Sequence, residues 1–315
     1  MRILSIDGGG IRGLIPALVL AEIEARTGRR IAELFDLVAG TSTGGILACA
    51  LTMPAADGSG APRYRAVELA SLYVEEGGDI FHRSLLKRVA SADGLLDERY
   101  DDDGLMRALR KYFGDARLRD ALVPVMVTAY EIGRRDAFFF RSARAREDPA
   151  YDFSLVEVTR STSAAPTYFE PFQATAAGGG PAYALVDGGV FATNPAMCAY
   201  ADAIAAEPVE LAVSLGTGQL TRPLDYRKVR SWGQLEWARP VIDVVFDGVA
   251  DTVDFQLGRL LGTENYVRLQ TQLTRASDDL DDASDGNLAA LREEAAALLR
   301  ARDADVDALC ARLTA

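Results

Sequence analysis

Histidine is almost missing from this sequence, and its scarcity limits the catalytic machinery that the chain can assemble. The single histidine of the 315 residues, His82, precedes the acidic candidate Asp187, whereas α/β-hydrolase triads run serine, acid, histidine along the chain. A serine-histidine-acid triad in that order is therefore excluded. We interpret His82, between Phe81 and Arg83, as a surface or packing residue.

Cysteine is also scarce. Cys49, Cys198 and Cys310 are odd in number and widely spaced, and no Cys-x-x-Cys pair occurs, which argues against a disulfide framework and against a zinc site. We interpret them as small buried hydrophobic residues. We expect no bound metal and no cofactor.

The one segment that suggests calcium is the acidic run at residues 278–282, and it does not fit the EF-hand pattern. Ala283 occupies a ligand position, and Arg292 stands where the closing glutamate belongs. We therefore expect calcium-independent activity.

Long hydrophobic runs and excess positive charge are missing as well. The apolar stretch Leu14–Leu20 contains Pro16 and follows Asp7 and Arg12, so it lacks the flanks of a signal peptide and is too short to cross a bilayer. We expect a cytoplasmic location, with contact at the periphery of a membrane. The formal net charge of −12 argues against a nucleic-acid partner and disfavours simple attraction to anionic lipid.

What is present is an alternation of short apolar runs and longer segments with helical spacing, which predicts an α/β fold with a mostly parallel sheet covered on both faces. The predicted strands are 3–6, 37–39, 123–129, 184–186 and 211–215. The predicted helices are 15–26, 45–53, 103–113 and 194–206, with one or two amphipathic helices over 288–313 after a cap at 285–287.

The segment Gly40-Thr41-Ser42-Thr43-Gly44-Gly45 follows a predicted strand and precedes a predicted helix, matching the Gly-x-Ser-x-Gly nucleophile elbow. Its glycines leave room for a tight turn that exposes the serine hydroxyl at a helix N-terminus. The Thr43 amide and the helix dipole would then face a developing oxyanion. A plain Gly/Ser/Thr-rich turn is the alternative reading of the pentapeptide alone.

The segment Asp7-Gly8-Gly9-Gly10-Ile11-Arg12-Gly13 follows the first strand, and its amides can form a nest for an oxyanion or a phosphate. Gly8, Gly10 and Gly13 also satisfy Gly-x-Gly-x-x-Gly, which makes a dinucleotide-binding oxidoreductase the competing interpretation. That fold needs an acidic residue at the end of the second strand, where this chain has the serine elbow, and Asp36 lies at the strand's start.

Asp187-Gly188-Gly189 ends another predicted strand, which suits a carboxylate at the carboxyl edge of a sheet. Alone, Asp-Gly is a common turn. A serine hydroxyl at its ordinary pKa needs an adjacent base, however, and with histidine so scarce a carboxylate is the natural substitute.

Together these motifs resemble the patatin-like phospholipases, in particular the bacterial lipid acyl hydrolases of that family. The similarity continues through 162–169, 187–191, 194–196 and 214–218, although Thr193 replaces an asparagine and could alter local packing. The resemblance implies a three-layer α/β/α domain over 1–300, with the helical tail 286–315 packed on the same domain.

The resemblance also implies a Ser-Asp dyad that cleaves carboxylic esters of membrane lipids, of the phospholipase A or lysophospholipase type. Ser42 would be the nucleophile and Asp187 the base. The expected oxyanion site comprises the amides of Gly8, Gly9, Gly10 and Thr43 together with Arg12, and the remaining motif residues are Gly13, Gly40, Gly44, Gly188 and Gly189. A carboxylesterase or transacylase on the same site is the alternative.

Three further expectations concern the surroundings of this site. Arg12 would support negative charge near the site or bridge to a surface carboxylate. Phe138–Phe140 or Leu85-Leu86 would line an acyl groove or pack in the core. The apolar segment Trp232–Leu261 fits core or subunit packing best, including a homodimer surface, and transient membrane docking second.

An unperturbed aspartate titrates near 4, so the base is expected to be ionised throughout the neutral range unless burial raises its pKa. The sequence thus predicts a flatter neutral pH profile than that of a Ser-His enzyme.

Overall fold

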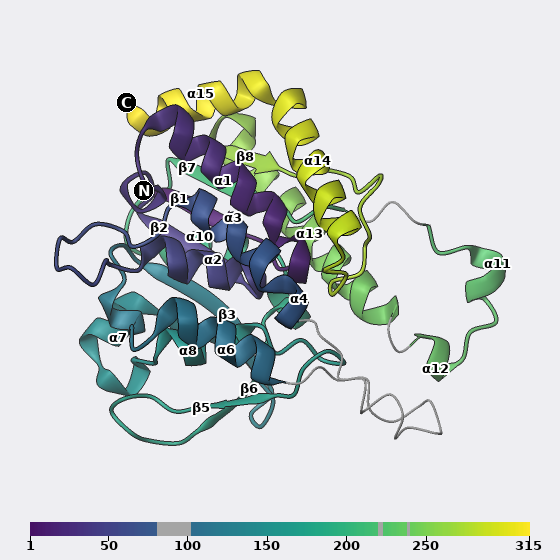
Figure 1. Cartoon of the computed structure of the whole chain (residues 1–315), viewed down its shortest axis with the longest axis horizontal. Helices are drawn as coiled ribbons and strands as arrows, with labels where there is room; N and C mark the ends of the chain where they lie inside the picture. The colour runs from purple at the N-terminus through teal and green to yellow at the C-terminus, as the bar shows by residue number, and fades with distance from the viewer. Residues whose placement is uncertain (81–101, 220–222, 238–239) are drawn as a thin grey trace.

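The computed structural model describes residues 1–80, 102–219, 223–237 and 240–315 (Figure 1). His82 and Leu85-Leu86 lie outside the described residues. The described strands form one sheet with the order β5-β6-β3-β2-β1-β7-β8, and β4 also pairs with β3. Their bounds are β1 Arg2–Ile6, β2 Leu37–Thr41, β3 Val125–Glu131, β4 Asp136–Arg141, β5 Phe172–Ala174, β6 Tyr183–Asp187, β7 Leu211–Leu215 and β8 Tyr266–Leu269.

The centre of this sheet is parallel, as the sequence predicted. Strands β3, β2, β1, β7 and β8 run in the same direction as their neighbours along this path. Strands β4 and β6 pair antiparallel with β3, and β5 pairs antiparallel with β6. The central strands β2 and β7 are buried along their whole length, which is why they consist of nearly continuous apolar runs.

Helices cover both faces of the sheet (Figure 1). The longer ones are α1 Leu14–Thr27, α2 Thr43–Thr52, α3 Ala66–Glu75, α6 Asp102–Phe113, α8 Leu155–Thr162, α10 Ala196–Ala203, α13 Pro240–Asn265, α14 Asp285–Ala301 and α15 Asp303–Thr314. The shorter ones are α4 Gly77–Ile80, α7 Ser142–Glu147, α9 Gly189–Ala192, α11 Tyr226–Val229 and α12 Gln234–Trp237.

The alternation of side chains along β1 shows how the layers form. Leu4 and Ile6 point into one core cluster, which they share with α1, α2 and α14, whereas Ile3 points into a second cluster with α10 and α13. Each face of the sheet is therefore closed by its own helical layer, which gives the three-layer α/β/α architecture.

The predicted elements lie where the sequence placed them, with a few differences. Strands β5 and β8 were not predicted, and Phe138–Phe140 belong to the unpredicted strand β4, where Phe138 and Phe140 pack edge to face. The cap of α14 is Ser284, whose hydroxyl accepts the Asn287 amide, rather than 285–287. Helices α14 and α15 both pack against α1.

Among the described residues, no helix combines the length with the hydrophobicity that a membrane span requires.

Candidate active site

Ser42 occupies the turn between β2 and α2 in a conformation that serine rarely adopts. Its φ of 55° and ψ of −123° are strained for a residue with a Cβ. The turn holds this shape because the Ser42 amide donates to Thr162 Oγ1 at 2.8 Å, and Thr162 Oγ1 in turn donates to the Thr128 carbonyl at 2.6 Å. A Cβ on Gly40 would collide with the Gly44 backbone, so the first glycine of the motif is needed for space.

The glycine-rich loop between β1 and α1 lies directly beside this turn. The Gly8 amide donates to the Thr193 carbonyl at 2.9 Å, so Gly8 is removed from the predicted set of oxyanion donors. The amides of Gly9, Gly10 and Thr43 have no acceptor among the described residues. Three of the four predicted amide donors therefore lie in the wall of one pocket without an acceptor among the described residues.

Two glycines of this loop allow close contacts that a side chain would block. A Cβ on Gly9 would overlap the Thr217 side chain, whose hydroxyl donates to the Gly8 carbonyl at 2.7 Å. Gly10 has a φ of +56°, and a Cβ there would overlap the Leu280 carbonyl, which accepts the Ile11 amide at 2.9 Å. The acidic segment 278–282, which suggested calcium, therefore contacts the glycine-rich loop through Leu280.

Asp187 ends β6 and is 1% exposed. Its Oδ1 accepts the Gly189 amide at 2.8 Å. Burial raises the pKa of Asp187 to about 7, while hydrogen bonding from the Ser42 side chain and the Gly189 amide lowers it. An ionised base throughout the neutral range was expected only if burial left this pKa unchanged, and the burial of Asp187 removes that condition.

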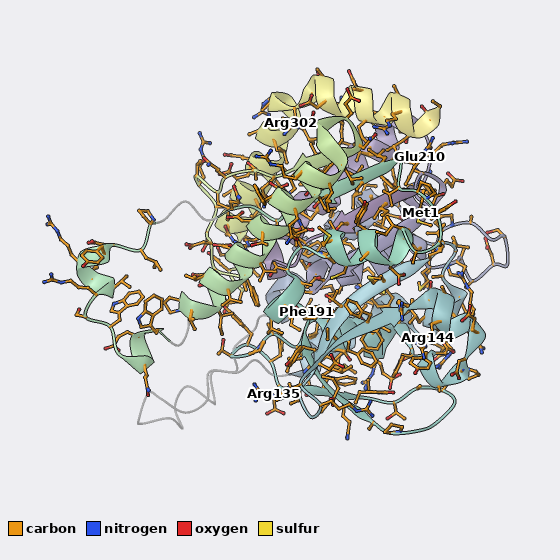
Figure 2. The ribbon with its side chains drawn as sticks, turned by 180° about the vertical axis from the view of Figure 1, so that it is seen from behind. Met1, Arg135, Arg144, Phe191, Glu210 and Arg302 are labelled. Atoms are coloured by element: carbon orange, nitrogen blue, oxygen red, sulfur yellow. The ribbon has the colours of Figure 1, made fainter. Side chains whose placement is uncertain are left out.

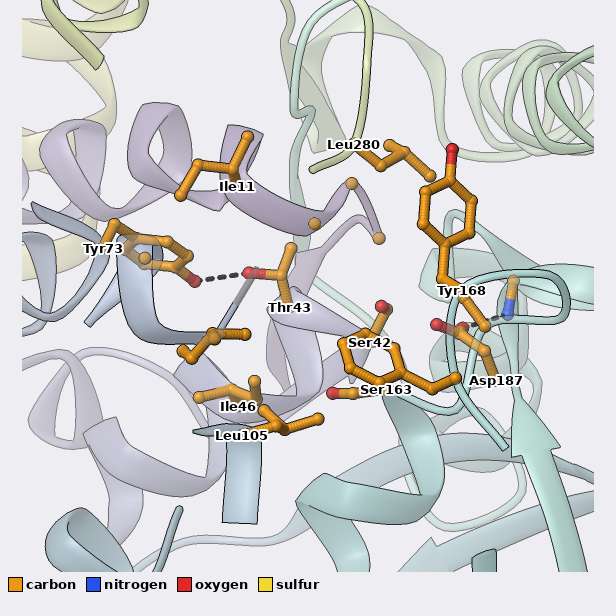
Figure 3. Close-up of a pocket in the computed structure, with 18 of the residues that line it drawn as sticks. Ile11, Ser42, Thr43, Ile46, Tyr73, Leu105, Ser163, Tyr168, Asp187 and Leu280 are labelled. Atoms are coloured by element: carbon orange, nitrogen blue, oxygen red, sulfur yellow. Dashed lines mark hydrogen bonds between the residues drawn. The ribbon is translucent and has the colours of Figure 1, made fainter. Parts of the chain in front are cut away.

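Ser42 and Asp187 line one mainly apolar pocket of about 70 Å³ (Figure 3). The aliphatic part of its wall is formed by Ile11, Ile46, Leu72, Ile80, Leu105 and Leu280. The polar groups in the wall are few: the Thr43 hydroxyl is hydrogen-bonded to the Tyr73 hydroxyl, and the buried Ser163 Oγ has no hydrogen-bond partner within the described structure. The space beside Ser42 is therefore lined mainly by apolar groups.

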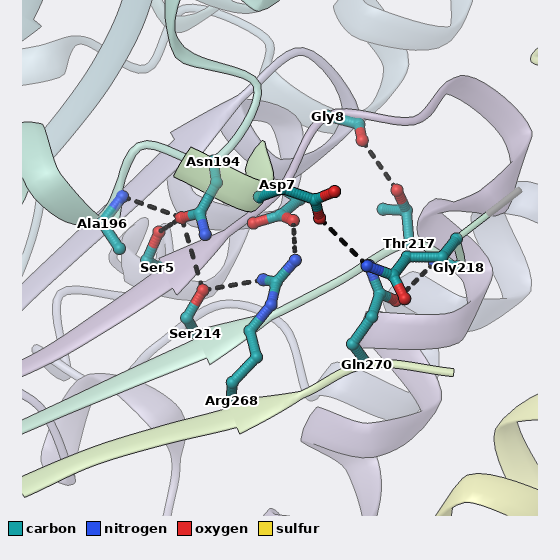
Figure 4. Close-up of polar contacts among 12 residues, drawn as sticks. Ser5, Asp7, Gly8, Asn194, Ala196, Ser214, Thr217, Gly218, Arg268 and Gln270 are labelled. Carbon is teal, nitrogen blue, oxygen red and sulfur yellow. Dashed lines mark hydrogen bonds and ion pairs between the residues drawn. The ribbon is translucent and has the colours of Figure 1, made fainter. Parts of the chain in front are cut away.

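Arg12 is buried but does not line this pocket. It borders a second cavity of about 230 Å³, together with the ion pair between Arg268 and Asp7 at 2.6 Å (Figure 4). The Arg12 Nε donates to the Gly9 carbonyl at 3.4 Å, so Arg12 contacts the glycine-rich loop from the side away from Ser42. The structure does not show the predicted bridge from Arg12 to a surface carboxylate among the described residues.

The polar network behind the glycine-rich loop was not foreseen from the sequence. Arg268 also donates to Ser214 Oγ at 2.8 Å, and Ser214 lies beside Asn194, whose Oδ1 accepts the Ala196 amide at 3.0 Å (Figure 4). These groups come from β7, β8 and the start of α10. They fix the end of β1 from which the glycine-rich loop departs.

The other predicted motif glycines act by allowing close packing. A Cβ on Gly44 would collide with the Ile6 carbonyl, one on Gly13 with the Thr43 hydroxyl, and one on Gly188 with the Thr128 hydroxyl. Gly189 lines the pocket and lies against the Phe246 ring of α13. Thr193, where the sequence departs from the usual motif, borders both cavities and fixes Gly8 through its carbonyl.

Comparison with known proteins agrees with this architecture. The protein-family model for patatin-like phospholipases matches residues 4–200. Patatin-like protein 2 of Oryza sativa subsp. indica is 33% identical, over 91% of this chain and 81% of that protein. Patatin-like protein 2 of Arabidopsis thaliana is 34% identical, over 95% of this chain and 83% of that protein.

Two further proteins are similar to this chain. A relative named probable inactive patatin-like protein 9, from Arabidopsis thaliana, is 35% identical over 85% of this chain and 74% of that protein. The solved structure of VipD from Legionella pneumophila aligns with 95% of this chain and 67% of that chain, at 14% identity and a TM-score of 0.37. On the strength of the family match and the curated relatives, the chain belongs to the patatin-like phospholipase family.

Proposed function

We propose that this protein is a lipid acyl hydrolase of the phospholipase A or lysophospholipase type, with Ser42 as nucleophile and Asp187 as base. The patatin-like domain supports lipid acyl hydrolysis in general. Because one similar relative is named probable inactive, family membership alone does not carry the proposal. The observation that carries it is the meeting of strained Ser42, buried Asp187 and three free amides at one apolar pocket.

In the proposed mechanism, Ser42 Oγ attacks the ester carbonyl and its proton passes to the Asp187 carboxylate. The negative charge that develops on the carbonyl oxygen is stabilised by the amides of Gly9, Gly10 and Thr43, each worth about 3 kcal/mol in such sites. Collapse of the intermediate breaks the bond to the alcohol, which leaves with the proton from Asp187. The acyl group stays on Ser42.

The second half of the reaction repeats the same steps with water. Asp187 takes a proton from water as the oxygen attacks the acyl-enzyme, and the returning proton restores the Ser42 hydroxyl as the fatty acid leaves. Asp187 must be ionised at the start of each half. Because its pKa is about 7, a substantial fraction is protonated at neutral pH and the rate should rise with pH through this region.

The pocket wall supports a lipid substrate over a polar one. Six aliphatic side chains surround the space beside Ser42, and burying an acyl chain against them is favoured by about 0.8 kcal/mol per methylene. A phospholipid or another acyl lipid is therefore the proposed substrate. Short esters would also enter, so a carboxylesterase or a transacylase on the same site remains the second candidate.

The direct test measures fatty acid release from mixed phospholipid vesicles and hydrolysis of a short-chain p-nitrophenyl ester, with chelator present throughout. The parent is compared with Ser42→Ala and Asp187→Asn. Ser59→Ala and Asp57→Asn, in an exposed loop, are matched controls.

The proposal expects both site variants to lose activity while circular dichroism shows them folded, and both loop variants to keep it. The preferred substrate then separates phospholipase from esterase. An active Ser42→Ala protein would contradict the proposed nucleophile.

A further inference from the structure

A short arm, residues 223–237, stands clear of the globular body. It contains α11 and α12 and leads through residues 238–239 to the first residue of α13, Pro240. Figures 1 and 2 both show α11 and α12 projecting beyond the sheet and its covering helices. A segment that extends so far from the core has little of its own surface to bury, so its composition reflects what it meets outside the protein.

The arm carries both tryptophans of the whole chain. Trp232 and Trp237 pack edge to face with ring centroids 5.3 Å apart, and each remains partly exposed. Tyr226 is 77% exposed and Leu224 is 46% exposed. Tryptophan and tyrosine are enriched at membrane-water interfaces, where the ring meets lipid and the polar group meets water.

The arm also carries three cations against two carboxylates, Asp225 and Glu236, in a protein that is acidic as a whole. Arg227, Lys228 and Arg230 are all exposed, whereas the whole chain has a formal net charge of −12. Within the described residues none of these three side chains forms an ion pair; the Asp225 carboxylate instead caps α11 by accepting the Arg227 amide. Charges farther away than a Debye length of about 8 Å are screened, so a local cluster can contact anionic lipid although the protein as a whole is acidic.

The start of α13 continues the same surface toward the pocket. Val241, Val244 and Val245 are each more than 40% exposed. The next residue, Phe246, lines the pocket that contains Ser42. The exposed apolar surface therefore lies within one helical turn of the pocket wall.

We propose that the arm and the first turns of α13 dock on the surface of an anionic phospholipid bilayer and place the pocket at that surface. The cations would meet lipid phosphates while the aromatic rings and valines enter the interface. Docking would bring lipid to Ser42, so this inference rests on the proposed function. The sequence alone favoured core or subunit packing for this segment, and the exposure of these side chains counts against core packing.

The two tryptophans make this docking measurable without a label. Because the chain has no other tryptophan, its tryptophan fluorescence reports on the arm alone. Ser42→Ala protein is mixed with vesicles of phosphatidylcholine, or of phosphatidylcholine and phosphatidylglycerol in equal amounts, so that lipid is not consumed. A blue shift that is larger with the anionic vesicles is the expected result.

Charge reversal tests the electrostatic part of the proposal. The triple variant Arg227→Glu, Lys228→Glu, Arg230→Glu should partition into anionic vesicles at least about 100-fold more weakly, since each of the three cations near such a surface is worth about fivefold. The matched control reverses the exposed Arg29, Arg135 and Arg144, of which Arg144 lies across the molecule from the arm (Figure 2). It should bind nearly as well as the parent.

Activity separates this inference from the proposed function. In the active protein, the arm variant and Trp232→Ala/Trp237→Ala should lose hydrolysis of anionic vesicles but keep hydrolysis of a short soluble ester. If vesicle binding is equal in the arm and control variants, docking by the arm is wrong, although ester hydrolysis would still support the proposed function. If the blue shift instead follows protein concentration without lipid, and light scattering shows a dimer, the arm binds a second copy of the chain and the proposal is overturned.

Discussion

Replacing Asp187 with asparagine should stabilise the protein, and the gain should depend on pH. In the native state burial raises the pKa of Asp187 from 3.8 to about 7. Between these values the folded protein holds a proton that the unfolded chain has released, so stability falls as pH rises from about 4 to about 7 and is then constant. The difference of about 3 pKa units corresponds to a loss of about 4 kcal/mol above pH 7.

Asparagine has no charge to bury, and its side-chain oxygen can still accept the Gly189 amide. The Asp187→Asn protein should therefore gain stability relative to the parent as pH rises, by about 3 kcal/mol between about pH 4.5 and about pH 8.5. Urea unfolding followed by circular dichroism at the two pH values measures this, with exposed Asp136→Asn as the control. If the difference between Asp187→Asn and the parent is the same at both pH values, the carboxylate is not destabilised by burial and the reasoning is refuted.

Three further results are expected. The kcat/KM of the parent for a soluble ester should increase with pH and level off above about pH 7, because the base must be ionised; a profile that is flat from about pH 5.5 to pH 8.5 would count against the raised pKa of Asp187. Thr162→Val leaves the Ser42 amide without its acceptor and should cost about 1–3 kcal/mol in urea unfolding and about tenfold in kcat, whereas Thr162→Ser should keep both. Gly9→Ala drives a Cβ into Thr217 and should displace an oxyanion donor, lowering kcat about 100-fold in the ester assay; an unchanged kcat would exclude the Gly9 amide from the mechanism.

The nucleophile elbow could be predicted because its cause is local. A strand, a tight turn and a helix within about a dozen residues determine where Ser42 lies, and the glycines that permit the turn are visible in the sequence. The same holds for the central strands, whose buried apolar runs are bounded by turn residues.

Features that depend on distant partners could not be predicted in this way. Gly8 looked like an oxyanion donor until its amide was found paired with the Thr193 carbonyl, far along the chain. The pKa of Asp187 depends on how deeply the fold buries it, which no local motif reveals. Strand β8 was hidden because it directly follows the long helix α13 and is only four residues long.

The exposed start of α13, next to the arm, could not be predicted from the sequence either. An apolar stripe at helical spacing usually faces a protein's own core, and the buried Val253 and Leu257 of α13 do so. The valines near the start of the same helix are exposed, because α11 and α12 lead the chain away from the sheet before α13 returns to it. Periodicity identifies an apolar face without identifying what covers it.

Covalent labelling with a fluorophosphonate, followed by peptide mass spectrometry, tests whether Ser42 is the nucleophile activated by Asp187. We expect one adduct, on the peptide that contains Ser42, absent from Ser42→Ala and formed much more slowly in Asp187→Asn. Its rate in the parent should rise with pH through about 7. An adduct on Ser163, the other serine in the pocket, or equal labelling of the parent and Asp187→Asn, would contradict the account.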